Sequence, residues 1–137
     1  KSYNLKFDIV LIVEPTSPFR RPQDVENTLK EMIVNDGDSS VCVSPLNTKH
    51  HPLKALQIIS GKLSHYNQLG ENITARQQLD QLFIRNGVCY AVSRNYLLEH
   101  KSLFSNNTYS YIVDRNIVNI DDSIDIEWAN FLLKKEQ

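Results

Sequence analysis

The feature that most constrains the fold is an apolar segment, residues 7–13, that runs directly into the turn Pro15-Thr-Ser-Pro18. A near-continuous run of β-branched and large apolar residues is typical of a strand buried on both faces of a sheet. The two prolines have no N–H to donate, so they end the strand. Thr16 and Ser17 then lie at its carboxyl end, where ligands bind in open α/β sheets. The pattern predicts a binding edge at this turn.

Length and composition predict one globular domain with a single core. The chain has 137 residues, 41% of them hydrophobic and 23% charged, and a net charge of −1. This balance gives no basic field for nucleic acid, and the longest apolar run, residues 9–13, is too short to cross a membrane. Cys42 and Cys89 lie in strand-like segments without the spacing of a zinc site. We expect free thiols in a reduced cytoplasm.

The first half of the chain predicts a strand, a helix and a second strand. Pro22 and two early acidic residues favour a helix over residues 22–35, followed by a strand over residues 40–44. This order predicts a right-handed crossover that makes the two strands a parallel pair. The expected buried stripe of the helix follows the spacing i, i+4, i+7, i+8. It consists of Val25, Leu29, Met32 and Ile33.

The second half predicts a hairpin and further α/β elements. Residues 56–63 resemble a hairpin around Ser60-Gly61-Lys62, and a polar loop follows. We then expect helices over residues 76–83, 96–100 and 122–134, and strands over residues 87–93, 109–113 and 117–120. The expected apolar face of the last helix is Ile124, Trp128, Phe131 and Leu132. The fold class is α/β: a mixed, mostly parallel sheet with flanking helices and an inserted hairpin region, residues 45–110.

Acidic residues gather at the start of the last helix. Asp121 follows a short apolar segment, and Asp122 and Asp125 come directly after it. One or two carboxylates together with phosphate oxygens are what Mg²⁺ prefers. Capping of the helix is the alternative interpretation of the same cluster.

The remaining polar candidates are weaker when each is taken alone. Arg76 could bind a carboxylate or phosphate through two hydrogen bonds, or could simply be solvated. Asn86-Gly87 is typical of a turn before a strand. His50 and His51 are adjacent and therefore project apart, which favours a loop role before Pro52. Lys54 could neutralise an anionic substrate.

Four motifs in order resemble one family. They are Glu14-Pro-Thr-Ser-Pro-Phe-Arg20; His51-Pro-Leu-Lys54; Arg76-Gln77 with Phe83-x-x-Asn86-Gly87-x-x-Tyr90; and Asn119-Ile-Asp121 with Asp125. Together they are similar to motifs of the cytidylyltransferases that activate sialic acid and related nine-carbon acids as CMP sugars. The resemblance spans nearly the whole chain and implies a Rossmann-like nucleotidyltransferase fold.

The resemblance implies nucleotidyl transfer from CTP to an acidic nine-carbon sugar, with Mg²⁺ as cofactor, in a homodimer. It also implies that the inserted hairpin region, residues 45–110, serves sugar binding and dimerisation. It implies catalytic roles for Asp121 and Arg76, and a metal site of Asp121 and Asn119. The substrate-binding residues that it implies are Glu14, Thr16, Ser17, Arg20, Lys54, Gln77, Phe83 and Asn86.

Three positions depart from the family pattern. Asn119 stands where the family usually has aspartate, Glu14 where it has glutamine, and Phe83 where tyrosine is common. The chain also lacks the family's N-terminal Arg- and Gly-rich loop that holds CTP, so we expect a C-terminal part that is inactive alone. Two alternatives stay open: a non-catalytic remnant or dimerising interaction module, and a synthetase for legionaminic or pseudaminic acid.

Overall fold

The computed structural model describes residues 6–135, which divide into two compact units. Of the described residues, the sheet unit comprises 6–44 and 85–135, and the hairpin unit comprises Pro45–Ile84. The region predicted for sugar binding and dimerisation, residues 45–110, therefore includes the hairpin unit and part of the sheet unit. Its role stays a prediction. Within residues 6–135, no helix is both long and apolar enough to cross a membrane.

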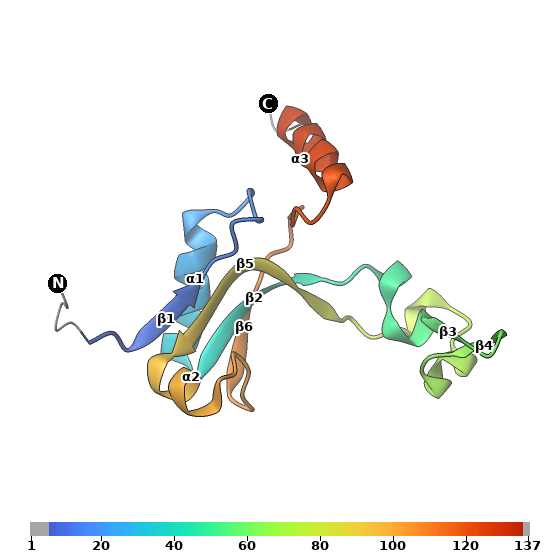
Figure 1. Ribbon diagram of the computed structural model, residues 1–137, viewed down its shortest axis with the longest axis horizontal. Coiled ribbons are helices and arrows are strands. Elements are labelled where there is room, and N and C mark those ends of the chain that lie inside the picture. The colour runs from blue at the N-terminus through green and yellow to red at the C-terminus, as the bar shows by residue number, and fades with distance from the viewer. Residues whose placement is uncertain (1–5, 136–137) are drawn as a thin grey trace. The chain divides into compact units, whose positions relative to one another are not determined.

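The sheet unit contains a four-stranded mixed sheet in the order β1-β5-β2-β6 (Figure 1). The strands are β1 (Ile9–Ile12), β2 (Ser39–Pro45), β5 (Phe83–Ser93) and β6 (Thr108–Ile112). β1 runs antiparallel to β5, and β2 runs parallel to β6. The helices are α1 (Pro22–Val34), α2 (Arg94–His100) and α3 (Ser123–Lys135). The predicted α/β class with a mixed sheet and flanking helices is confirmed.

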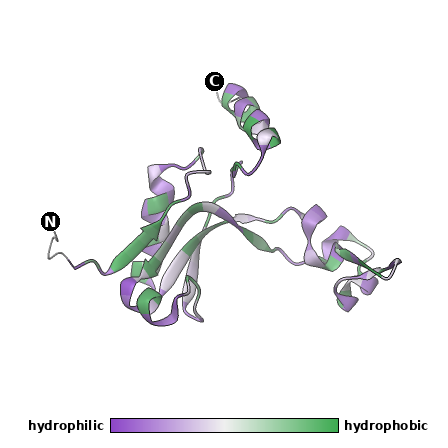
Figure 2. Cartoon of the chain, in the orientation of Figure 1, coloured by the Kyte–Doolittle hydropathy of each residue, from purple (hydrophilic) through white to green (hydrophobic). Residues whose placement is uncertain are grey.

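Two predictions about the first strand are wrong. β5 lies between β1 and β2, so the strand–helix–strand order does not produce a directly paired parallel couple. β1 is at the end of the strand order, and Leu11 and Val13 are 42% and 45% exposed, so the strand is not buried on both faces. The strand with the long buried run is β5, whose residues 86–92 are all buried while residues 83–85 are exposed. Figure 2 shows the hydrophobic colouring of both strands.

The core lies between β5, β2 and α1. Cys42, Val88, Cys89 and Val113 form one buried cluster, against which Val25 of α1 packs. Both cysteines are free thiols, as predicted. The buried residues of α1 are Asp24, Thr28 and Met32, while Ile33 is 60% exposed. Val25 and Met32 of the predicted stripe therefore face the core as expected, whereas Ile33 does not, and the polar Asp24 and Thr28 share the buried face.

The end of the chain packs differently from the prediction. Residues 117–120 form no strand, although the Ile120 N–H donates to the Thr16 carbonyl at 2.9 Å. Ala129 and Leu132 of α3 pack with Val118 in a second cluster that includes Phe19. Ile124, Trp128 and Phe131 are 65%, 47% and 54% exposed, so three of the four predicted apolar contacts of this helix are wrong.

The hairpin unit is built around a short antiparallel pair, β3 (Leu56–Ile59) and β4 (Lys62–His65). Ser60 and Gly61 have φ values of 52° and 78°, as a two-residue turn of this kind requires. The predicted hairpin is confirmed. Four 3₁₀ turns surround it: Thr48–His50, Pro52–Lys54, Gln68–Asn72 and Arg76–Gln78. The helix predicted over residues 76–83 is wrong except for the last of these turns.

Candidate functional site

The turn after β1 is held in place by buried hydrogen bonds. Ser17 is buried, and its hydroxyl donates to the Asn86 carbonyl at 3.2 Å. The Arg20 guanidinium donates to two backbone carbonyls, that of Val88 at 2.7 Å and that of Glu14. Arg20 thus braces the turn from inside the sheet unit. Its predicted role in binding substrate stays a prediction.

Asn86 and Gly87 form the wall beside this turn. The buried Asn86 amide donates to Ser44 Oγ at 3.0 Å, and its oxygen accepts from the Val88 N–H at 3.1 Å. Gly87 has φ +69°, and a Cβ there would clash with the Glu14 carboxylate. Only glycine allows the chain to pass so close to that side chain.

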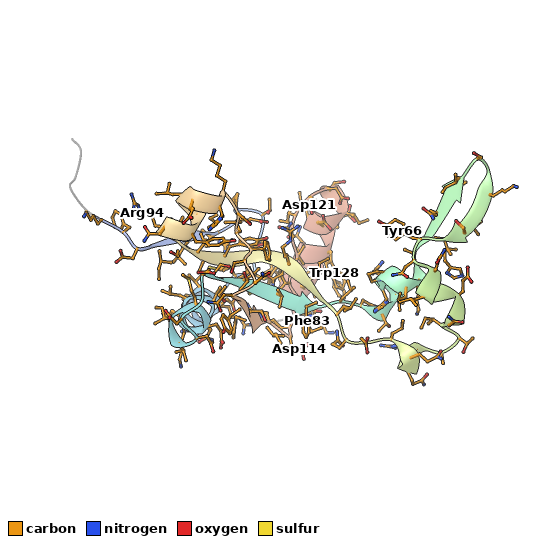
Figure 3. The ribbon with its side chains drawn as sticks, turned by 90° about the horizontal axis from the view of Figure 1, so that it is seen from below. Tyr66, Phe83, Arg94, Asp114, Asp121 and Trp128 are labelled. Atoms are coloured by element: carbon orange, nitrogen blue, oxygen red, sulfur yellow. The ribbon has the colours of Figure 1, made fainter. Side chains whose placement is uncertain are left out.

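Asn119 joins the turn to the acidic cluster before α3. Its side-chain oxygen accepts from the Thr16 hydroxyl at 2.6 Å, and the Ser17 hydroxyl lies 3.5 Å away. Its amide nitrogen donates to the Asp121 carboxylate at 3.3 Å. One side chain thus contacts Thr16 and Asp121 and lies within 3.5 Å of the Ser17 hydroxyl. Figure 3 labels Asp121 beside the first turn of α3.

Two residues of the acidic cluster, Asp122 and Asp125, cap α3, and the third, Asp121, does not. Asp122 Oδ1 accepts from the N–H groups of Ile124 and Asp125, at 3.0 and 3.2 Å. Asp125 Oδ2 in turn accepts from the N–H groups of Asp121 and Asp122, at 2.9 and 3.1 Å. These bonds cap α3. The Asp121 carboxylate takes no part in capping and stays exposed, with the Asn119 amide as its hydrogen-bond donor.

The two predicted magnesium ligands, Asp121 and Asn119, differ in how well they suit the ion. Asp121 keeps free carboxylate lone pairs, which suit Mg²⁺. The Asn119 oxygen already accepts from Thr16, so binding a metal would require its amide to rotate. Within residues 6–135, no group of three or more His, Cys, Asp or Glu side chains could hold a metal. Asp121 thus fits as one ligand beside phosphate oxygens, and Asn119 fits better as its support.

Glu14 and Tyr90 lie on the other side of the turn. Burial raises the pKa of Tyr90, and a hydrogen bond to the Glu14 carboxylate and the charge of that group raise it further. Tyr90 is therefore a neutral donor to Glu14 at physiological pH. The family pattern includes this tyrosine, but the sequence did not single out its contact with Glu14.

Sequence reasoning also missed a buried ion pair between Arg115 and Asp24. Arg115 forms a forked ion pair with the buried Asp24, with one N–H···O distance of 2.9 Å, and donates to the Phe19 carbonyl at 3.1 Å. Burial alone would raise the pKa of Asp24, but hydrogen bonds from Arg115 and from the Arg21 N–H lower it overall. No local sequence signal marks Arg115, because its partner lies 91 residues earlier.

The other predicted substrate-binding residues belong to the hairpin unit. They are Lys54, Arg76, Gln77 and Phe83, and all four are exposed. Their roles, including a catalytic one for Arg76, stay predictions. The loop role predicted for His51 is confirmed, because its Nδ1 accepts from the Leu53 N–H at 3.2 Å and caps the following turn.

Comparison with known proteins finds relatives whose sequences match most of this chain. No family model matches the chain. It is 27% identical over 123 residues to the CMP-N,N'-diacetyllegionaminic acid synthase of Legionella pneumophila, covering 90% of this chain and 52% of that protein. It is 22% identical over 135 residues to post-translational flagellin modification protein B of Campylobacter coli, covering 98% of this chain and 56% of that protein. The chain thus spans about half the length of these curated relatives.

A solved structure supports the same fold. The structure of CMP:2-keto-3-deoxy-manno-octonic acid synthetase complexed with CTP matches 97% of this chain and 64% of that one, with a TM-score of 0.64 and 15% identity. This match confirms the predicted nucleotidyltransferase fold. The sequence relatives confirm the family resemblance that the four motifs indicate.

Proposed function

We propose, from the relation of this chain to the CMP-sialic-acid-type cytidylyltransferases, that it supplies the sugar side of such an enzyme's active site. The observation that carries the proposal is the Asn119 bridge, which joins the Thr16–Ser17 turn to Asp121. Hydroxyl and carboxylate groups from two distant segments meet at the carboxyl end of β1. This is where an α/β sheet binds a polar ligand.

The proposed reaction is transfer of a cytidylyl group to a nonulosonic acid. The anomeric hydroxyl of the sugar gives its proton to solvent as its oxygen attacks the α-phosphorus of CTP, the bond to the bridging oxygen breaks, and pyrophosphate leaves with the electron pair. Such transfers depend on positioning and on neutralising charge. The Thr16 and Ser17 hydroxyls, the Asn86 wall and the Arg20-braced turn would orient the sugar.

We propose Asp121 as the residue that holds Mg²⁺, which supplies positive charge to the phosphate oxygens when bound. Asn119 would keep the carboxylate aimed through its amide hydrogen bond. The free thiols of Cys42 and Cys89 support a reducing compartment, and we propose the cytoplasm.

We also propose a homodimer formed through the hairpin unit. β3 and β4 pair Ile58 with Leu63, and both side chains are largely exposed, as is that of Leu56 on the same face of β3. Exposed apolar side chains gathered on a short hairpin are typical of an interaction surface. Ile58→Glu should shift a dimer to monomer in light scattering coupled to gel filtration. Gln57→Glu, on the other face of the same strand, is the matched control.

Turnover can be tested in a chimera. The matched stretch of the Legionella relative is replaced by this chain, and pyrophosphate release is measured with CTP, Mg²⁺ and a nonulosonic acid. We expect CTP-dependent release that Asp121→Asn lowers by about 100-fold or more without a change in melting temperature. A chimera that folds but releases no pyrophosphate would favour the alternative, a non-catalytic remnant or interaction module.

The sugar is proposed to be of the legionaminic or sialic type. The similarity to a CMP-N,N'-diacetyllegionaminic acid synthase over 90% of the chain favours the former. Comparing kcat/KM for legionaminic, pseudaminic and sialic acids in the chimera would rank these substrates.

A further inference from the structure

Among residues 6–44 and 85–135, the Glu14 carboxylate has no cationic partner within 4.0 Å. A Cβ on Gly87 would clash with Glu14 Oε2 and lie 3.0 Å from Ser17 Oγ, so the carboxylate rests against the Gly87 backbone beside the Ser17 hydroxyl. Within residues 6–135, the ion pairs closer than 4.0 Å join Asp24 to Arg115 and Glu99 to His100. Glu14 is in neither pair.

The neighbouring arginines are engaged elsewhere. Arg20 donates to the carbonyls of Val88 and of Glu14 itself, and not to the Glu14 carboxylate. Arg85 lies over the Phe104 ring, 5.7 Å from its centroid. The Tyr90 hydroxyl is near enough for the Glu14 charge to raise its pKa. A single neighbouring hydroxyl leaves most of the accepting capacity of a carboxylate free, because its two oxygens offer about four lone pairs.

An acceptor-only group at this place limits what a ligand can present to it. A glutamine, usual at this position in the resembling family, can both donate and accept. A carboxylate repels a carbonyl oxygen and forms its strongest hydrogen bonds with a cationic nitrogen. The half-buried position of Glu14 strengthens that preference, since water screens the charge less.

We propose that Glu14 selects a sugar acid that carries a free, protonated amino group over the same sugar with that group acylated. The inference rests on the proposed function, because it assigns the substrate class of the same site. The ammonium group meets Glu14 beside Ser17 and Gly87. An acyl carbonyl at that point meets a negative charge and the close-packed Gly87 backbone.

The test measures binding of three methyl glycosides that differ only at carbon 5: neuraminic acid (amine), N-acetylneuraminic acid (acetamide) and 2-keto-3-deoxynonulosonic acid (hydroxyl). Glycosides are used because free neuraminic acid cyclises. Kd is obtained at pH 7 from the amide NMR shifts of Ser17 and Gly87. We expect the amine to bind about tenfold tighter than the acetamide. Glu14→Gln should abolish this ratio, and Glu26→Gln, an exposed change of the same charge on α1, should keep it.

Every other outcome contradicts either the inference alone or the inference together with the proposed function. If the hydroxyl compound binds but the amine is not preferred, or if Glu14→Gln keeps the preference, the inference fails and the proposed function stands. If none of the three shifts these amides in a protein with an unchanged melting temperature, both fail. If Mg²⁺ alone shifts Gly87 in the wild type but not in Glu14→Gln, Glu14 is a metal ligand and the inference is overturned.

Discussion

The Thr16 hydroxyl donates to Asn119 Oδ1 at 2.6 Å, across 103 residues of sequence. The Ile120 N–H donates to the Thr16 carbonyl at 2.9 Å, so side chain and backbone bind the same two segments together. The turn after β1 and the approach to α3 therefore form one structural unit. A change at Asn119 should affect both segments.

Asn119→Asp should make stability depend on magnesium. The new carboxylate still accepts from Thr16, but it replaces the donor to Asp121 with a like charge. We expect a lower melting temperature than wild type without Mg²⁺, and a larger rise when Mg²⁺ is added. Asn130→Asp, an exposed change of the same charge on α3, is the control. An equal response to Mg²⁺ in both variants would contradict the proposal that Asp121 holds Mg²⁺.

Gly87→Ala should destabilise the sheet unit by about 2–4 kcal/mol, from the left-handed backbone and from the clash with Glu14. Urea unfolding measures the loss. The double variant with Glu14→Ala should recover the part due to the clash, leaving about 1–2 kcal/mol of backbone strain. No recovery in the double variant would mean that the Glu14 carboxylate does not pack against Gly87.

Stability should fall at acid pH through Asp24. The pKa of this carboxyl is lowered in the folded protein from its usual 3.8, so its stabilising contribution is complete above that value and is lost as pH falls through the folded pKa. Asp24→Asn should lower the free energy of unfolding by about 2–4 kcal/mol at pH 7. This range is set below the cost of breaking a fully buried pair because Arg115 is 24% exposed. The variant should also show a weaker pH dependence below pH ~4. Urea unfolding between pH 3 and 7 tests this, and parallel curves for both proteins would contradict it.

Both thiols should resist alkylation in the native protein. Burial and the nearby Cys42 raise the pKa of Cys89 to about 11, and burial raises that of Cys42. Since the thiolate is the reactive form, iodoacetamide at pH 8 should label neither cysteine until urea unfolds the chain. Mass spectrometry counts the labels. Rapid labelling without urea would mean that the β2–β5 core opens easily.

The sequence predicted most elements because their signals are local. Pro22 and the early acidic residues mark the start of α1, and Ser60-Gly61 marks the hairpin turn. The place of β5 between β1 and β2 could not be predicted, because β5 follows an insertion of some forty residues, Pro45–Ile84, and pairs across it. The polar part of the buried face of α1 was missed for a related reason. Asp24 tolerates burial only because Arg115 pairs with it.

The candidate site likewise combines features that have a local sequence signal with features that depend on long-range contacts. Thr16 and Ser17 could be placed at a strand end from the two prolines alone, and Asp122 could be recognised as a helix cap. The bridging role of Asn119 depends on a contact between distant segments. It could not be distinguished in the sequence from a metal ligand next to Asp121.

The most direct test of the account is a titration of the protein with the methyl glycoside of 2-keto-3-deoxynonulosonic acid, followed by ¹H–¹⁵N NMR. The amides of Ser17 and Asn119 report the two segments, and Asn130 reports the distant surface of α3. We predict that Ser17 and Asn119 shift together and saturate with one Kd, while Asn130 does not move. Shifts in only one segment, or in neither, would contradict a sugar site formed by both.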